Sequence, residues 1–144
     1  MALDTSGRWW TGTEFGDLIQ YLRALTAEGY PADEVRQSVC TCGSTTFHLE
    51  ADREAGCARR VCVACSSSAF IADSAEVWAE AEPEQVRCPC GGRQLELGVA
   101  FSKRLNGEVR WVTVGQRCLA CGVLASFADW EIDGAPTAHL LTLV

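Results

Sequence analysis

Two pairs of short cysteine stretches decide the fold: Cys40-Thr41-Cys42-Gly43 with Cys62-Val63-Ala64-Cys65, and Cys88-Pro89-Cys90-Gly91 with Cys118-Leu119-Ala120-Cys121. Together they use eight of the nine cysteines in the 144-residue chain. Four thiolates that arrive as two close pairs from separate segments form the ligand set of a tetrahedral Zn²⁺ site. The sequence therefore predicts two zinc sites, and their metal ligands are Cys40, Cys42, Cys62 and Cys65 in the first site and Cys88, Cys90, Cys118 and Cys121 in the second.

Disulfide bonding is the alternative use of these cysteines. The odd number of cysteines and the Cys-x-Cys spacing, which is awkward for a local bridge, argue against it. The chain has no apolar run long enough to span a bilayer, and its first residues lack a signal-peptide apolar region. We therefore expect a cytoplasmic protein, in which thiols stay reduced and clustered cysteines bind metal.

The residues between the paired stretches predict two β-hairpins. Residues 46–50 alternate in hydrophobicity before turn residues 52–56, and residues 94–101 alternate before a hairpin turn at Asn106-Gly107. The spacing from Cys42 to Cys62 is 20 positions and that from Cys90 to Cys118 is 28. The difference of 8 adds four residues to each strand, and an even extension keeps the same side chains on the buried face.

A third strand is expected after each second stretch, at residues 69–72 and 124–130. The chain thus contains a tandem repeat of cysteine knuckle, hairpin, knuckle and strand. Both copies resemble zinc ribbons, which are small three-stranded antiparallel modules built on two cysteine knuckles, although the first knuckle of each copy is Cys-x-Cys rather than Cys-x-x-Cys. Glycines follow three of the four knuckles, where a positive φ turns backbone N–H groups toward sulfur, and Ser66 follows the other.

The predicted fold class is a small metal-bound α+β protein, in which an amphipathic helix packs on two zinc-ribbon-like three-stranded antiparallel sheets. Thr11 and Glu14 form a candidate capping box for that helix, and a second helical turn is expected from Pro31 to Val35. Asp17 is expected on the polar side of the helix, and the expected buried face consists of Phe15, Leu18, Ile19, Leu22 and Leu25. The expected parts are a helical segment (1–37), ribbon 1 (38–73), an acidic linker (74–86), ribbon 2 (87–133) and an apolar tail (134–144). We expect the tail and the Trp9-Trp10 pair to pack on the core.

The charge favours a protein partner. The formal net charge is −7, and each zinc bound by four thiolates adds a further −2, so two filled sites bring it to −11. An acidic body repels a phosphate backbone unless its cations are gathered in one place. We interpret the chain as a non-enzymatic two-zinc module that recognises a basic protein partner, of the inhibitor, immunity or regulatory adaptor type.

Nucleic-acid binding is the main alternative. Seven of the twelve Lys and Arg residues lie on the two hairpins, and Arg104, Arg110 and Trp111 could form a small basic and aromatic surface for single-stranded nucleic acid. In the opposing interpretation these arginines solvate the strands and pair with Glu96 and Glu108.

Enzymatic and redox functions have weaker signals. His48 and Glu50 followed by Cys62 and Cys65 imitate the zinc-binding motif of nucleobase deaminases, but Val61 stands where that motif has proline and Cys40 and Cys42 would be unused. Four cysteines can also hold iron, as in rubredoxin-like electron carriers. Cys57, the ninth cysteine, is expected to be a small buried side chain, and His48 to face solvent or a carboxylate.

Overall fold

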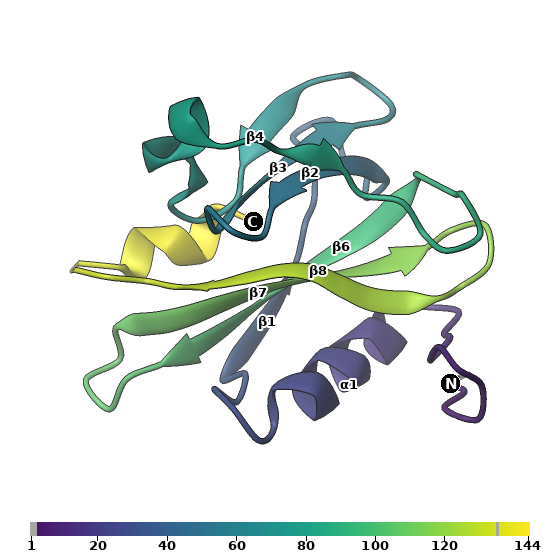
Figure 1. Ribbon diagram of the computed structural model, residues 1–144, viewed down its shortest axis with the longest axis horizontal. Helices are drawn as coiled ribbons and strands as arrows, with labels where there is room; N and C mark the ends of the chain where they lie inside the picture. Colours follow the sequence, from purple (N-terminus) through teal and green to yellow (C-terminus); the bar gives the residue numbers. More distant parts are fainter. Residues whose placement is uncertain (1–2, 135) are drawn as a thin grey trace.

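The computed structural model describes residues 3–134 and 136–144 as one helix and one connected antiparallel sheet (Figure 1). The elements in chain order are α1 (Phe15–Thr26), β1 (Glu34–Gln37), β2 (Phe47–Asp52), β3 (Cys57–Cys62), β4 (Ser68–Phe70), the 3₁₀ turns η1 (Ser74–Glu76) and η2 (Trp78–Glu80), β5 (Glu84–Gln85), β6 (Leu95–Lys103), β7 (Val109–Cys118), β8 (Leu124–Glu131) and η3 (Ala138–Thr142). No helix among these residues is long and apolar enough to cross a membrane.

The main path of the sheet has the order β4-β3-β2-β6-β7-β8, with β1 paired to β6 and β5 paired to β2. The prediction of two separate sheets was wrong in this respect, because Phe47 of β2 pairs with Leu95 of β6 and joins them. β1 occupies the rest of the same edge of β6, from Gly98 to Phe101. An unpaired edge of β6 would leave a row of backbone N–H and C=O groups without partners, and these two contacts remove it.

The two halves of the sheet have equivalent pairing registers. Phe47 lies opposite Cys62 and Leu95 lies opposite Cys118, so each hairpin is set in the same way relative to its cysteines. Cys57 lies five residues before Cys62, and Thr113 is at the equivalent position, five residues before Cys118. Cys57 pairs with Asp52, and Thr113 pairs with Ala100. The second hairpin is eight residues longer than the first, and these residues are divided unequally. β6 is three residues longer than β2, β7 is four longer than β3, with an irregularity at Lys103, and the loop is one longer.

The strands form two layers with apolar side chains between them (Figure 1). β2, β3 and β4 lie over β6, β7 and β8, and the interlayer core includes Phe47, Leu49, Leu97 and Phe101. The C-terminal residues enter the same core through Leu140, which is 4% exposed, with Leu141 and Val144 partly buried against it. Cys57 is fully buried, as expected.

α1 covers the outer face of β6, β7 and β8. Leu18 and Leu22 are fully buried there, whereas Leu25, expected on the buried face, is 50% exposed. A Cβ atom at Gly115 would lie 2.6 Å from Leu22, so Gly115 provides the notch in the sheet into which Leu22 fits. Trp10 packs on this cluster and against Tyr21, with 5.9 Å between ring centroids, while Trp9 is 44% exposed.

Two predictions in the N-terminal segment were wrong. The capping box consists of Glu14 and Asp17 rather than Thr11 and Glu14, because Thr11 is engaged in backbone pairing with Asp4 and Val123. Asp17, expected on the polar side, is therefore fully buried with its carboxylate on the N–H groups of residues 13 and 14.

The second error concerns the residues after Pro31. They form strand β1 instead of a helical turn, because the exposed edge of β6 offers partners that a short isolated helix lacks. The N–H of Asp33 donates to the carbonyl of Phe101, and the N–H of Lys103 donates to the Asp33 carboxylate, so the pairing is fixed at the start of the strand.

The Leu22 contact predicts how α1 is held. Leu22→Ala empties the notch at Gly115, and loss of a fully buried leucine costs about 2–5 kcal/mol. Leu25→Ala, three residues along the same helix but half exposed, should cost less than about 1 kcal/mol. Urea unfolding followed by circular dichroism measures both, and equal losses for the two variants would contradict the packing described here.

Candidate metal centres

The structure brings the eight predicted ligands into two groups of four. One group is Cys40, Cys42, Cys62 and Cys65, and the other is Cys88, Cys90, Cys118 and Cys121. Within each group the sulfur atoms all lie within 4.8 Å of one another, and all nine cysteines of the chain are free thiols. Each group could therefore hold one metal ion.

The sulfur spacing fits a tetrahedral metal site better than disulfides. The Sγ–Sγ distances include 3.5 and 3.6 Å in the first group and 3.4 and 3.7 Å in the second. Bonds of about 2.3 Å from zinc to four sulfurs place the sulfurs about 3.8 Å apart at the corners of a tetrahedron. A disulfide would need about 2.05 Å.

The four knuckles share one backbone design. In the first knuckle of each group, Gly43 and Gly91 donate N–H bonds to the carbonyls of Cys40 and Cys88, both at 2.8 Å. In the second knuckle, Ser66 and Gly122 donate to the carbonyls of Cys62 and Cys118, at 2.9 and 2.8 Å. The residue after each knuckle has a positive φ, between 66° and 95°. These turns aim both cysteine side chains of a knuckle at one point, as the glycine pattern predicts.

Each group has two buried and two exposed sulfur ligands. Cys40, Cys62, Cys88 and Cys118, the first cysteine of each knuckle, are at most 5% exposed, and the second cysteine of each knuckle is exposed. A metal ion in either group would lie at the surface of the sheet, held from the core side by two sulfurs and closed from outside by the other two. Four thiolates complete a tetrahedral coordination shell and leave no position for water or substrate.

The surroundings of the two groups differ. The Ser67 hydroxyl lies 3.4 Å from the sulfur of Cys40 and 3.2 Å from that of Cys65. Val123 is five residues after Cys118, as Ser67 is after Cys62, so the second group has an apolar side chain where the first has a hydroxyl. A backbone N–H bond at Cys42 and the Ser67 hydroxyl lower the pKa of Cys40 to about 5, whereas burial raises the pKa of Cys88.

The hydrogen bonds of backbone N–H groups to sulfur also occur in the second group. The N–H of Gly92 lies 3.4 Å from the sulfur of Cys90 and lowers the pKa of that thiol to about 7. A metal ion competes with protons for these sulfurs, so acidification should release it from both groups.

The deaminase motif is not assembled around the first group. The Glu50 carboxylate accepts two hydrogen bonds from Arg59, at 2.8 and 2.6 Å. His48 is half-buried in a surface hollow beside Arg93 and Leu119, next to the second group. Cys40 and Cys42 complete the first group without either residue.

The residues proposed for partner contact, Arg104, Arg110 and Trp111, lie near each other at one end of the sheet. Tyr30 stacks on Trp111 with 4.8 Å between ring centroids, and the Arg110 guanidinium lies 4.6 Å from the Tyr30 ring. The Trp111 indole N–H donates to Asp129 at 3.0 Å, and Arg104 donates to the carbonyl of Ile132. The sequence did not single out Tyr30, because nothing in its local pattern places it against Trp111.

The expected pairing of these arginines was wrong. Glu96 accepts a hydrogen bond from Arg117 at 2.9 Å, and Glu108 binds the backbone and hydroxyl of Thr137. Among the described residues no ion pair involves Arg104 or Arg110, and the Nε atom of Arg110 is buried without a hydrogen-bond partner.

Single ligand replacements test the two groups. Cys40→Ser should lower the metal content from two ions per chain to one and unfold the β2-β3 hairpin, since metal binding to such a site supplies on the order of 10 kcal/mol. Elemental analysis and circular dichroism measure the two effects. Cys57→Ser, a buried cysteine outside both groups, is the matched control and should keep two ions. A wild-type protein that folds stably without metal would contradict the assignment.

Ser66 gives a second test. Ser66 has a φ of 66°, in the left-handed region that is unfavourable for residues with a Cβ atom, and its side chain is exposed. Ser66→Gly should stabilise the protein by up to about 1 kcal/mol in urea unfolding, whereas Gly122→Ser should destabilise it because the new Cβ would also approach the Gly12 carbonyl at 2.7 Å. A neutral or destabilising Ser66→Gly would show that the serine has another role.

The comparisons with known proteins add no family to this description. Searches against protein-family models, curated proteins and solved structures found no match for this chain. The assignment of the two groups as candidate metal centres therefore depends on their own geometry: eight thiols, in two groups whose sulfur atoms lie within 4.8 Å of one another, on four equivalent knuckles.

Proposed function

We propose that this chain is a non-enzymatic protein-binding module whose two zinc-ribbon-like halves are each held by one structural zinc ion. Zinc is the metal for which four thiolates in a tetrahedral arrangement are the commonest structural ligand set. The equivalent registers of the two hairpins support a tandem repeat. Because four cysteines close each coordination shell, neither metal ion would have a position at which to activate water, and this favours a structural role over catalysis.

The observation that carries the proposal is a surface groove along β8. We define the β8 groove as two adjoining hollows that share Arg53, Ser126 and Phe127. Leu25, Tyr30 and Trp111 also line one hollow, and Trp9 also lines the other. Trp9, Leu25 and Tyr30 are 44%, 50% and 39% exposed. Large apolar side chains gathered on a concave surface favour a binding site, because water contact with them is unfavourable.

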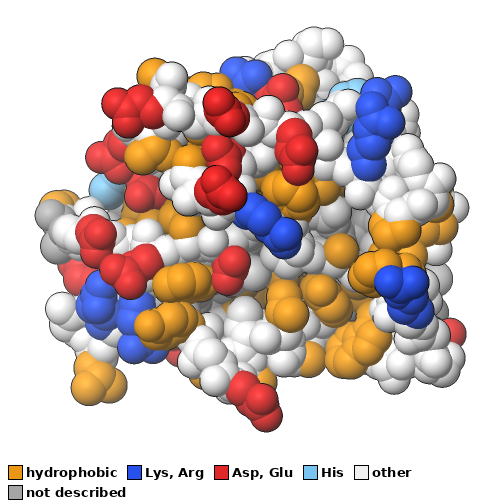
Figure 2. All heavy atoms as spheres, viewed as in Figure 1, with side chains coloured by type: hydrophobic (Ala, Val, Ile, Leu, Met, Phe, Trp, Pro, Cys, Tyr) orange, Lys and Arg blue, Asp and Glu red, His pale blue; other side chains and the backbone are white. Residues whose placement is uncertain are grey.

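The charge beside the groove supports a basic partner. Glu76, Glu80, Glu82 and Glu84 are all exposed on the segment from η1 to β5. Figure 2 shows acidic side chains gathered in the upper left of the face over which β8 runs, and apolar side chains across its lower right. Complementary charge speeds and selects such an encounter. An inhibitor, an immunity protein or a regulatory adaptor would use a surface of this kind.

Nucleic-acid binding is the second candidate, and the Tyr30-Trp111 stack with Arg110 beside it is the feature that favours it. Two contacts weaken this candidate. Tyr30 covers one face of the Trp111 ring, and the Asp129 carboxylate holds its N–H, which places a negative charge where a phosphate backbone would approach. We therefore favour a protein partner, in a cytoplasmic setting that keeps the nine thiols reduced.

Two matched leucine variants test the proposal. Leu25→Glu places a carboxylate in the β8 groove, and Leu105→Glu places the same charge on a fully exposed leucine at the tip of the β6-β7 hairpin. A partner captured from the source cells by wild type and by Leu105→Glu should be lost with Leu25→Glu. Once the partner is purified, calorimetry should show at least tenfold weaker binding for Leu25→Glu, because a buried unpaired carboxylate is costly.

Nucleic-acid binding provides the contrary outcome. If single-stranded oligonucleotides bind with submicromolar affinity near physiological salt, and Arg104→Ala with Arg110→Ala abolishes that binding, the nucleic-acid candidate replaces the proposal. A partner that binds both leucine variants equally would show that the β8 groove is not its site.

A further inference from the structure

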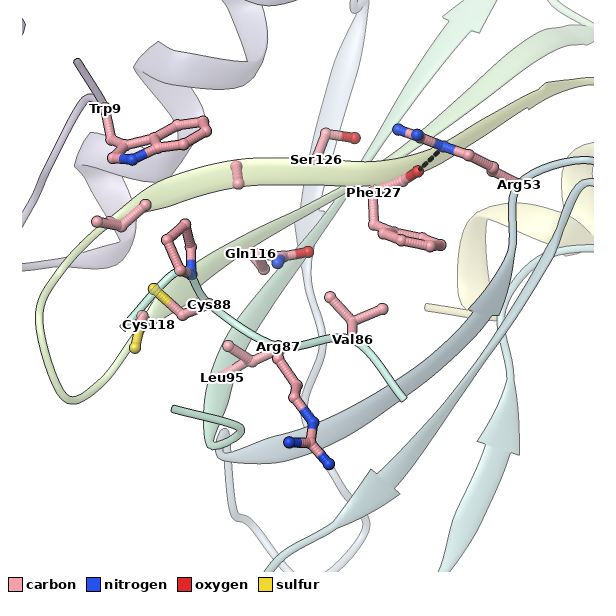
Figure 3. Close-up of a pocket in the computed structure, with 13 residues that line it drawn as sticks. Trp9, Arg53, Val86, Arg87, Cys88, Leu95, Gln116, Cys118, Ser126 and Phe127 are labelled. Carbon is pink, nitrogen blue, oxygen red and sulfur yellow. Dashed lines mark hydrogen bonds between the residues drawn. The ribbon is translucent and has the colours of Figure 1, made fainter. Parts of the chain in front are cut away.

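The Trp9 end of the β8 groove is a pocket of about 150 Å³ between β6, β7 and β8 on one side and residues 86–89 on the other. Its walls are mostly apolar: Val86, Leu95, Val123 and Phe127 line it, and the exposed Trp9 ring stands at its rim. Figure 3 shows Trp9, Val86, Leu95 and Phe127 around the pocket, with Cys88 and Cys118 of the second cysteine group at one side.

Polar side chains also line the pocket: Arg53 and Arg87 are exposed, Ser126 is half-buried, and Gln116 is the one that is buried. Gln116 follows Val112 and Val114 on the core-facing side of β7, where an apolar residue is expected, and it is 4% exposed. Its Oε1 atom is buried and has no hydrogen-bond partner among the described residues. In Figure 3 the Gln116 amide is drawn between Cys88 and Phe127, which line the same pocket. A buried acceptor without a donor is unfavourable, so Gln116 at this position favours a bound donor.

A bulge in β8 shapes the outer wall. Val114 pairs with Ala128 but Gly115 pairs with Ser126, so Phe127 is an extra residue without a pairing partner. Its carbonyl accepts a hydrogen bond from Arg53 at 3.1 Å, and the Arg53 guanidinium lies 4.9 Å from its ring. These contacts hold the Phe127 ring between the pocket and the second hollow of the groove.

The chemistry of the pocket specifies its ligand. We propose that it binds an aromatic side chain with a single hydrogen-bond donor, the phenol of tyrosine or the indole of tryptophan, from a basic segment of a partner protein, with the donor on Gln116 Oε1. The apolar walls match the ring, and one buried acceptor matches one donor. A nucleobase would bring several polar atoms against the apolar walls, and each atom left unpaired there would oppose binding.

The surface beside the pocket indicates why the ring would belong to a protein. A further hollow shares Arg53 and Phe127 with the β8 groove and is lined by Asp52, Glu54, Glu82 and Glu84, so its charges are predominantly negative. A chain that places an aromatic side chain in the pocket can place Lys or Arg in this acidic hollow at the same time. This step rests on the proposed function and names the kind of residue that the partner would contribute.

Two small probes of the same shape test the pocket itself. p-Cresol carries the phenol donor and toluene lacks it, and both can be titrated into the metal-loaded protein while the Trp9 indole and Gln116 amide signals are followed by NMR. We expect p-cresol to bind about five- to tenfold more tightly than toluene, the value of one hydrogen bond to a buried acceptor. In Gln116→Leu that preference should disappear or reverse.

Gln94→Leu is the matched control, because Gln94 is an exposed glutamine outside the pocket and should leave the preference unchanged. Two metal ions per chain in both variants would confirm that they fold. Equal binding of the two probes, binding of neither, or tighter binding of adenosine or uridine monophosphate than of p-cresol would overturn the proposal.

Capped peptides test the protein source. A peptide with tyrosine between lysines should bind more tightly than the same peptide with phenylalanine, or with glutamates in place of the lysines, and added salt should reduce the second difference. If p-cresol binds but the tyrosine peptide does not, the partner-protein assignment is wrong. If a purified partner requires Leu25 but these probes fail, the protein-binding function stands and the aromatic-anchor inference falls.

Discussion

The convergence of four cysteine sulfurs at each of two points is the constraint on which the rest of this structure depends. Each group ties the start of one strand of a hairpin to the end of the other, through knuckles with matching hydrogen bonds. Short hairpins bury too little apolar area to be stable alone. A metal ion bound by four thiolates supplies on the order of 10 kcal/mol, enough to offset the chain entropy that each hairpin loses.

The second level of organisation comes from β6, which joins the two halves. Its inward side chains Leu95, Leu97, Val99 and Phe101 belong to the interlayer core, and its outer face carries α1. Its free edge pairs with β1 and with Phe47 of β2, so the two hairpins, each with its own cysteine group, share one core. The high apolar content of the chain, 48%, is accounted for by this shared core rather than by the metal centres.

Several features of the site were missed because their signals are not local. Alternation of apolar and polar residues predicted β8, but the bulge at Phe127 reverses which face its later residues occupy. Leu124 packs under α1, whereas Ala128 and Trp130 enter the interlayer core. Gln116 could have been noticed as a polar residue at a core position of β7. Its meaning depends on Val86 and Phe127, which are brought beside it by contacts between distant segments.

The sequence by itself determined the eight candidate ligands, their division into two groups, the paired hairpins and the presence of an N-terminal amphipathic helix, because ligand spacing, side-chain alternation and helical periodicity are properties of contiguous residues. Only the tertiary structure decided that residues 34–37 form a strand, that the two halves share one sheet, and that Trp9, Gln116 and Phe127 line one pocket. Each of these features depends on which edge or surface another segment leaves open. The free energy that stabilises them comes from contacts between residues far apart in the chain.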